Sequence, residues 1–156
     1  MARLKHRLRP VGLEFLDSAP VRLVFSLAVA ASPEAVYRAL AEETGSWPEW
    51  FGAVRRARDT RTGRYVVLAG GAAFEETVLV AEAPRRYAYR TDAMNRPGVK
   101  ALLEEWRVEP VGRSSLVQWT VVAEPTRTGT ALLRVFAPAL RRSFRAAMRK
   151  LDERGV

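Results

Sequence analysis

The sequence predicts a single α+β domain in which a curved antiparallel sheet of about seven strands wraps around a long C-terminal helix. Three observations support this. The middle of the chain alternates apolar and polar residues between turn residues, which is typical of strands joined by hairpins. The segment from about Thr130 to Arg154 repeats apolar residues every three or four positions, as an amphipathic helix does. The length of 156 residues suits one domain with one core.

The first elements follow from alternation and helix-capping signals. Val21 to Val29 alternates as a strand and leads to Ser32 and Pro33, which suit the N-cap and the first turn of a helix. That helix is predicted to run to about Glu42. Pro48 then opens a second short helix, so two short helices are expected after the first strand.

The middle of the chain reads as a series of hairpins. Turn residues at Thr60–Gly63, Gly70–Gly71, Pro84–Arg85 and Pro110–Arg113 separate the predicted strands. Only the terminal helix is large enough to cover one face of such a sheet, so the strands are expected to curve around it. Pro138 is expected to kink or break that helix about two turns in.

The composition excludes several kinds of site. The sequence has no cysteine, so disulfides, thiolate metal sites and thiol nucleophiles are excluded. Its one histidine, His6, lies in a basic arm assigned to residues 1–12, ahead of the domain at 13–156, which argues against a histidine-based triad or metal site. Gly70–Gly71 lacks the spacing of a phosphate-binding loop. We therefore predict no cofactor and no metal.

The charge allows two interpretations. The formal net charge of +9 comes almost entirely from arginine and suits anionic membrane or nucleic acid, but it also fits a compositional preference for arginine. No nucleic-acid-binding motif accompanies it, so nucleic acid is disfavoured and transient contact with anionic membrane is retained. Without a signal-peptide pattern or an apolar run of roughly 18 residues, the cytoplasm is the expected location. Monomer and homodimer both remain open.

Several short motifs occur in the same order as these elements. Residues 31–37 (ASPEAVY) lead into residues 47–51 (WPEWF), residues 76–78 (ETV) precede residues 83–89 (APRRYAY), and residues 118–120 (QWT) follow late in the chain. In these motifs the chain resembles the START and birch-pollen-allergen superfamily (SRPBCC), and within it the bacterial polyketide cyclase/dehydrase branch. The resemblance covers nearly the whole chain and implies a helix-grip fold.

The resemblance also implies a function. It implies a cavity between the sheet and the C-terminal helix that binds or transports a lipid, a polyketide or an aromatic metabolite. Some members of the superfamily are aromatase/cyclases, but no acid/base set matched to theirs is identified in this sequence. Three functions therefore stay open: binding or transport of a hydrophobic small molecule, a cyclase, aromatase or dehydratase activity, and a charge-driven interaction with anionic membrane or nucleic acid.

Glu76 is the candidate catalytic residue. Alternation places it on one strand face with Phe74 and Val78, and an inward carboxylate among apolar neighbours would have a raised pKa. In the alternative reading the opposite face is inward, and Glu76 meets solvent or an arginine. Glu104 poses the same question, and we expect it to pair across the sheet with neighbours of Arg107.

The expected ligand-binding residues are mainly amphipathic aromatics that suit a pocket with a few polar groups. Arg142 joins them because it falls between the apolar stripe of the last helix and its basic row, Arg141, Arg145 and Arg149, where it would hold an anionic head group; a solvated surface arginine is the alternative. The full set is Trp47, Trp50, Phe51, Phe74, Glu76, Tyr87, Tyr89, Trp106, Trp119, Phe136 and Arg142.

Overall fold

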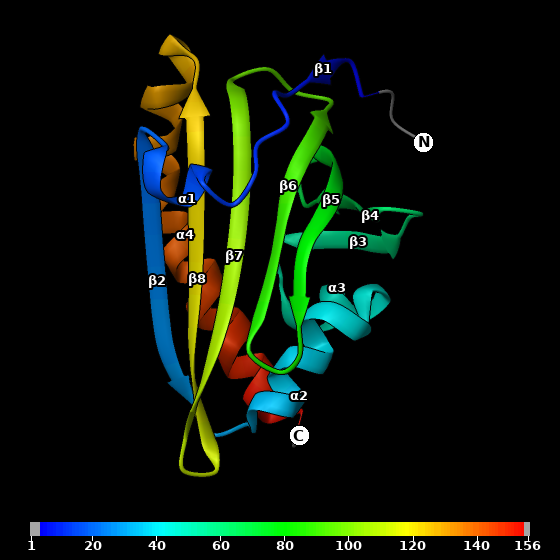
Figure 1. Ribbon diagram of the computed structural model, residues 1–156, viewed down its shortest axis with the longest axis vertical. Helices are drawn as coiled ribbons and strands as arrows, with labels where there is room; N and C mark the ends of the chain where they lie inside the picture. Colours follow the sequence, from blue (N-terminus) through cyan, green and yellow to red (C-terminus); the bar gives the residue numbers. More distant parts are fainter. Residues whose placement is uncertain (1–3, 155–156) are drawn as a thin grey trace.

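A computed structural model describes residues 4–154 and confirms the predicted α+β helix-grip architecture (Figure 1). The strands are β1 (His6–Arg7), β2 (Val21–Val29), β3 (Val54–Asp59), β4 (Gly63–Leu68), β5 (Ala73–Glu82), β6 (Arg86–Met94), β7 (Val99–Val111) and β8 (Ser114–Pro125). The helices are α1 (Phe15–Ser18), α2 (Pro33–Tyr37), η1 (Arg38–Glu42), η2 (Thr44–Ser46), α3 (Trp47–Trp50) and α4 (Arg127–Glu153).

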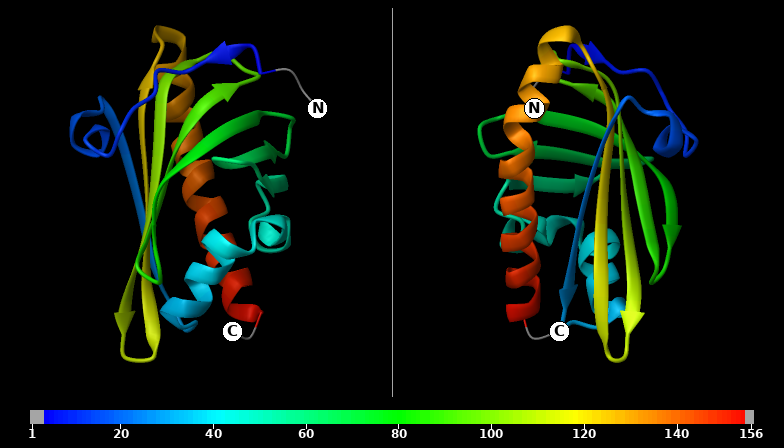
Figure 2. Two further views of the ribbon diagram at one scale, coloured as in Figure 1. Left: turned by 45° about the vertical axis from the view of Figure 1, so that its right-hand side comes forward. Right: turned by 90° about the vertical axis from the view of Figure 1, so that its left-hand side faces the viewer.

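The sheet is antiparallel throughout, with strand order β2-β8-β7-β6-β5-β4-β3, and β1 pairs with β6. It curls into a half-barrel, and α4 runs across the open, concave side (Figure 2). The short helices between β2 and β3 cover one end of that side. The concave face is therefore the only large surface enclosed between sheet and helix in the part of the chain that the structure describes.

The short helices after β2 are fixed by caps and by one indole. The side chain of Ser32 accepts a hydrogen bond from the backbone N–H of Ala35 at 3.2 Å and so caps α2, as predicted. The helix continues through the wider π turn of η1. Trp47 Nε1 donates to the backbone oxygen of Leu40 at 3.0 Å, which ties α3 to η1 and sets the orientation of the aromatic residues that follow.

The two halves of α4 differ in burial. In the second half, Phe144, Ala147, Met148 and Leu151 are buried against the sheet. In the first half, the inward-facing Leu133 is only half-buried. Asp152 holds the far end of the helix by accepting hydrogen bonds from two backbone N–H groups just beyond β2. The helix therefore closes one end of the concave side and leaves space at the other. Over residues 4–154, no helix has the length and apolar content needed to cross a membrane.

The expected break at Pro138 does not occur, because α4 runs without interruption from Arg127 to Glu153. A proline inside a helix leaves the carbonyl oxygen four residues earlier without its donor. Here that residue is Arg134, and both Pro138 and Arg134 are exposed. Solvent can hydrate the free carbonyl, so the helix persists.

The outer, convex face of the sheet is covered by the N-terminal segment. Leu8 N–H donates to the backbone oxygen of Asp92, and Arg9 N–H to that of Lys100. Val11 and Phe15 pack with Ala101, Leu103 and Val122 in a small second core. The basic residues 4–12 thus lie along the sheet, and ligand access to the concave face is left to the other side of the molecule.

Candidate functional site

The concave face carries a wall of aromatic rings. Trp106 and Trp119 oppose each other on β7 and β8, and their rings stack with centroids 5.1 Å apart. Phe51 meets both indoles edge-on, and Phe144 of α4 packs against both. Trp47 stacks on Phe51 from the side of α3. The structure thus brings most of the sequence-predicted aromatic residues into one cluster.

A buried ion pair lies beside these rings. Arg64 and Glu76 are register partners on β4 and β5, and Arg64 Nε and Nη2 donate to Glu76 Oε1 at 3.0 and 2.9 Å. The guanidinium lies between two rings, 4.5 Å from the centroid of Trp47 and 4.3 Å from that of Tyr89. Its Nη1 has no hydrogen-bond partner among the residues described. Glu76 is therefore inward, as one of the two sequence readings had it, but it is not free.

Glu104 is the second carboxyl group on this face. It accepts hydrogen bonds from the hydroxyl of Tyr89 at 3.1 Å and from Trp119 Nε1 at 3.0 Å. Trp106 Nε1 in turn donates to the Tyr89 oxygen at 3.2 Å. The expected pairing of Glu104 with neighbours of Arg107 is wrong. Strand alternation sends Glu105 to the convex face instead, where it accepts from the guanidinium groups of Arg86 and Arg107.

Burial dominates the electrostatics of this cluster. It raises the pKa of Glu104 to about 7, and the charge of Glu76 raises it further, while Arg64 and the two hydrogen bonds oppose the increase. Burial also raises the pKa of Glu76 against the lowering effect of Arg64. The pKa of Tyr89 lies well above its ordinary value for the same reason, so its hydroxyl stays protonated. Near neutral pH, the Glu104 carboxyl can both release and accept a proton.

The remaining candidate residues are spread more widely. Trp50 and Tyr87 are buried in the main core, and Phe74 is half-buried on β5. Phe136 lies apart from the aromatic cluster, because its side chain is 54% exposed on the first half of α4. Arg142 lines a groove on the other side of that helix.

Sequence reasoning missed Arg64 and expected the wrong partners for Glu104. Arg64 directly follows the predicted turn at Thr60–Gly63, and alternation places it on the same strand face as Val66. Its position opposite Glu76 could be found only once the pairing of β4 with β5 was known. Glu104 required the correct choice of inward face on β7. In both cases the missing information was the pairing between strands.

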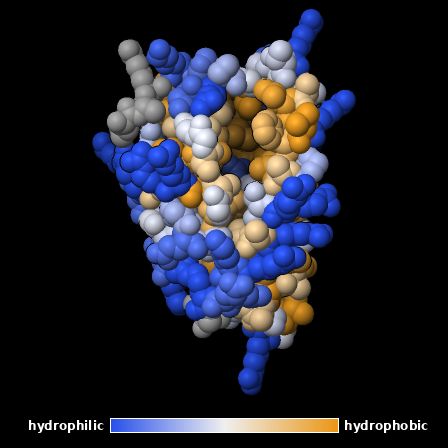
Figure 3. Space-filling model, turned by 180° about the vertical axis from the view of Figure 1, so that it is seen from behind, coloured by the Kyte–Doolittle hydropathy of each residue, from blue (hydrophilic) through white to orange (hydrophobic). Residues whose placement is uncertain are grey.

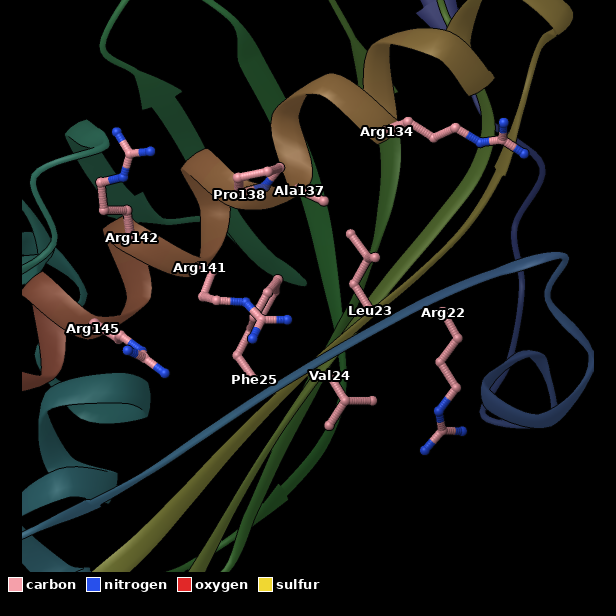
Figure 4. A pocket seen from close by; sticks show the side chains of 10 residues that line it. All are labelled: Arg22, Leu23, Val24, Phe25, Arg134, Ala137, Pro138, Arg141, Arg142 and Arg145. Atoms are coloured by element: carbon pink, nitrogen blue, oxygen red, sulfur yellow. The ribbon is translucent and has the colours of Figure 1, made fainter.

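The groove lies between the edge strand β2 and the middle of α4, from Arg134 to Arg145. It has a volume of about 700 Å³, and Figure 4 shows the side chains around it. An adjoining hollow of about 640 Å³ shares Arg22, Leu23, Arg134 and Ala137 with it. Seen from behind, the surface is also hollowed beside a patch of hydrophobic residues (Figure 3). Within residues 4–154, no three acidic or histidine side chains are grouped to hold a metal ion.

Comparison with known proteins gives consistent results. The sequence profile of the family described as "Polyketide cyclase / dehydrase and lipid transport" matches residues 20–155. An uncharacterized protein of Mycobacterium tuberculosis is 27% identical over 148 residues, which cover 90% of this chain and 88% of that protein.

Two solved structures share the fold at low sequence identity. A START superfamily protein from Mycobacterium smegmatis has a TM-score of 0.69 at 13% identity and covers 85% of this chain and 95% of its own. The Zhui aromatase/cyclase from a Streptomyces species has a TM-score of 0.71 at 13% identity and covers 86% and 92%.

Proposed function

Because the chain belongs to the polyketide cyclase / dehydrase and lipid transport family, we propose that it binds or transports a hydrophobic small molecule between the concave face of the sheet and α4. The ligand class we propose is a lipid, a polyketide or an aromatic metabolite. A single observation carries this proposal: the concave face is only partly covered by the helix that crosses it.

The partial cover is visible residue by residue. Leu23 of β2, Val78 of β5 and Leu102 of β7 are packed against the core, yet each remains half-buried. On α4, Leu140 is half-buried, whereas Phe144 one turn later is 1% exposed. Apolar surface that stays partly exposed to water favours ligand binding. Each 100 Å² of it removed from water contributes roughly 2.5 kcal/mol to the binding free energy, before the costs of association.

Polar groups on the concave face can supply orientation. Glu104 and the hydroxyl of Tyr89 form one hydrogen-bonded unit among aromatic rings. A ligand hydroxyl or carbonyl can replace part of that unit, because a carboxyl group with a pKa of about 7 donates in one protonation state and accepts in the other. A few convergent polar groups in an apolar pocket are typical of small-molecule sites.

The same carboxyl group supports a second candidate function, a cyclase, aromatase or dehydratase activity. General acid–base catalysis is most efficient when the pKa of the catalytic group lies near the working pH, and the pKa of Glu104 meets this condition. Glu76, the catalytic candidate from the sequence, directs Oε1 to both Arg64 donors and is better suited to positioning the guanidinium. We therefore assign the proton-transfer role in this alternative to Glu104.

Native mass spectrometry of protein purified from its own source tests the binding proposal. A stoichiometric apolar adduct, released by denaturation and identified, supports it; an unliganded protein that also takes up no Nile red contradicts it. Glu104→Gln is expected to weaken binding of the identified compound or to stop its conversion. Glu109→Gln is the matched control, because Glu109 lies on β7 with 59% of its side chain exposed.

A further inference from the structure

The groove between β2 and α4 carries five arginines. They are Arg22 on β2 and Arg134, Arg141, Arg142 and Arg145 on α4, and no aspartate or glutamate is among the residues, all within 4–154, that line it. We propose that this groove binds the anionic head group of the ligand, which is then an amphiphile with a phosphate or carboxylate at one end of an apolar chain. The inference rests on the proposed function, since the apolar chain would extend into the space beneath α4.

Most of these arginines have no polar partner among the described residues. Among the described residues, Arg134, Arg142 and Arg145 have no hydrogen-bond or ion-pair partner. Arg22 points to the other side of β2 from Leu23 and donates to the backbone oxygen of Leu16, and Arg142 points away from Arg141 (Figure 4), so the groups that face the groove are those of the other three. Other arginines of this chain do find carboxylates, as Arg64, Arg86 and Arg90 show. The groove thus concentrates guanidinium groups whose donors remain available.

The geometry directs three of these groups to one side of the helix. Arg134, Arg141 and Arg145 are spaced by seven and four residues, so they project from the same face of α4. Arg141 extends over the ring of Phe25, 5.8 Å from its centroid, across the gap between α4 and β2 (Figure 4). An anion placed there meets planar donors that are able to bind phosphate or carboxylate in a bidentate manner.

The floor of the groove is apolar. Leu23, Phe25, Ala137 and Pro138 line it between the arginines. Leu23 and Phe25 also belong to the main core or pack against it, on the side of β2 that faces the aromatic wall. The arginine-rich groove therefore adjoins the half-covered concave face across Phe25, which places a cationic and an apolar surface side by side, as an amphiphile requires.

Like charges this close repel, and a bound anion would relieve that repulsion. A flat membrane surface or a nucleic acid would also attract the arginines, but neither would fill a concavity of about 700 Å³ with an apolar floor. The observations therefore favour a single amphiphile over a macromolecular surface.

Isothermal titration calorimetry with dodecyl phosphate, below its micelle concentration, tests the proposal. Uncharged dodecyl ether of triethylene glycol and inorganic phosphate are the comparison ligands. The double variant Arg141→Gln/Arg145→Gln is expected to lose dodecyl phosphate affinity at least about tenfold while its affinity for the uncharged ether changes little. Arg113→Gln/Arg149→Gln removes the same charge from exposed positions outside the groove and is expected to behave as wild type.

The outcomes separate the two proposals. If the ether binds wild type but dodecyl phosphate binds no tighter, or the groove variant matches the control, the head-group site is refuted and the proposed function stands. If neither amphiphile binds, the amphiphile proposal is refuted, and mass spectrometry with Nile red uptake decides the proposed function separately. If inorganic phosphate binds as tightly as dodecyl phosphate, the apolar chain contributes nothing to binding, and the proposal that the ligand is an amphiphile is refuted. Groove-dependent binding to phosphatidylglycerol vesicles or duplex DNA without binding of dodecyl phosphate would assign the arginines to a macromolecular surface instead.

Discussion

Arg64 and Glu76 face each other across β4 and β5, and their side chains are only 2% and 4% exposed. Removing two opposite charges from water is costly, and their mutual attraction offsets that cost only while both are present. The rings of Trp47 and Tyr89 on either side of the guanidinium add cation–π attraction. The pair therefore behaves as one unit within the wall of the proposed ligand site.

Replacing one partner of this ion pair should destabilise the protein more than replacing both partners together. Glu76→Leu or Arg64→Met alone is expected to lower the free energy of unfolding by about 3–5 kcal/mol, because each leaves one buried charge without its partner. Arg64→Met/Glu76→Leu together should cost clearly less than the sum of the single variants. Urea denaturation followed by circular dichroism measures the cycle. Additivity within about 0.5 kcal/mol would show that the pair is not coupled.

The carboxyl group of Glu104 should make stability depend on pH. Its pKa of about 7 lies above the value of 4.5 for a free carboxyl group, so between these values the folded protein binds more protons than the unfolded chain. The free energy of unfolding then falls as pH rises through this window. Relative to wild type, Glu104→Gln should gain roughly 2–3 kcal/mol between about pH 4 and pH 8. A pH-independent difference in urea titrations would contradict the raised pKa.

The indole of Trp119 should hold that pKa down. Its Nε1 donates to Glu104, and a hydrogen bond to the ionised carboxylate favours that form. Trp119→Phe is therefore expected to raise the pKa of Glu104 further, as measured by carbon NMR of its carboxyl group. Trp50→Phe is the matched control, since Trp50 Nε1 has no partner among the described residues. An equal shift in both variants would attribute the effect to packing alone.

Two phenylalanines should show that the second half of α4 packs against the sheet more tightly than the first half. Phe144 is 1% exposed and Phe136 is 54% exposed. Phe144→Ala is expected to cost about 3–5 kcal/mol through lost burial and a cavity, whereas Phe136→Ala should stay within about 0.5 kcal/mol. Thermal and urea unfolding measure both. A cost above about 2 kcal/mol for Phe136→Ala would show that the first half of the helix packs more tightly than its exposure indicates.

The fold was recoverable from the sequence because its signals are local. Ser32 and Pro33 mark a helix start, and the apolar repeat ending in Phe144 and Leu151 marks the terminal helix. Pro138 was misleading because a proline breaks a helix most readily when the carbonyl group that loses its donor is shielded from water. Here that carbonyl belongs to the exposed Arg134. Phe136 was misleading for a related reason: helical spacing places it near the inward face but does not show where that face has nothing to pack against.

The sequence by itself determined the order of the elements, the curvature of a one-sided sheet around a single helix, and the presence of many aromatic residues within one core. Tertiary structure decided which carboxyl groups face inward and what they meet. Strand alternation has two solutions until neighbouring strands are paired, and only that pairing set Arg64 against Glu76 and left Glu104 with Tyr89 and Trp119. The same holds for the groove, because Arg22 and Arg141 share it through contact between segments more than a hundred residues apart in the sequence.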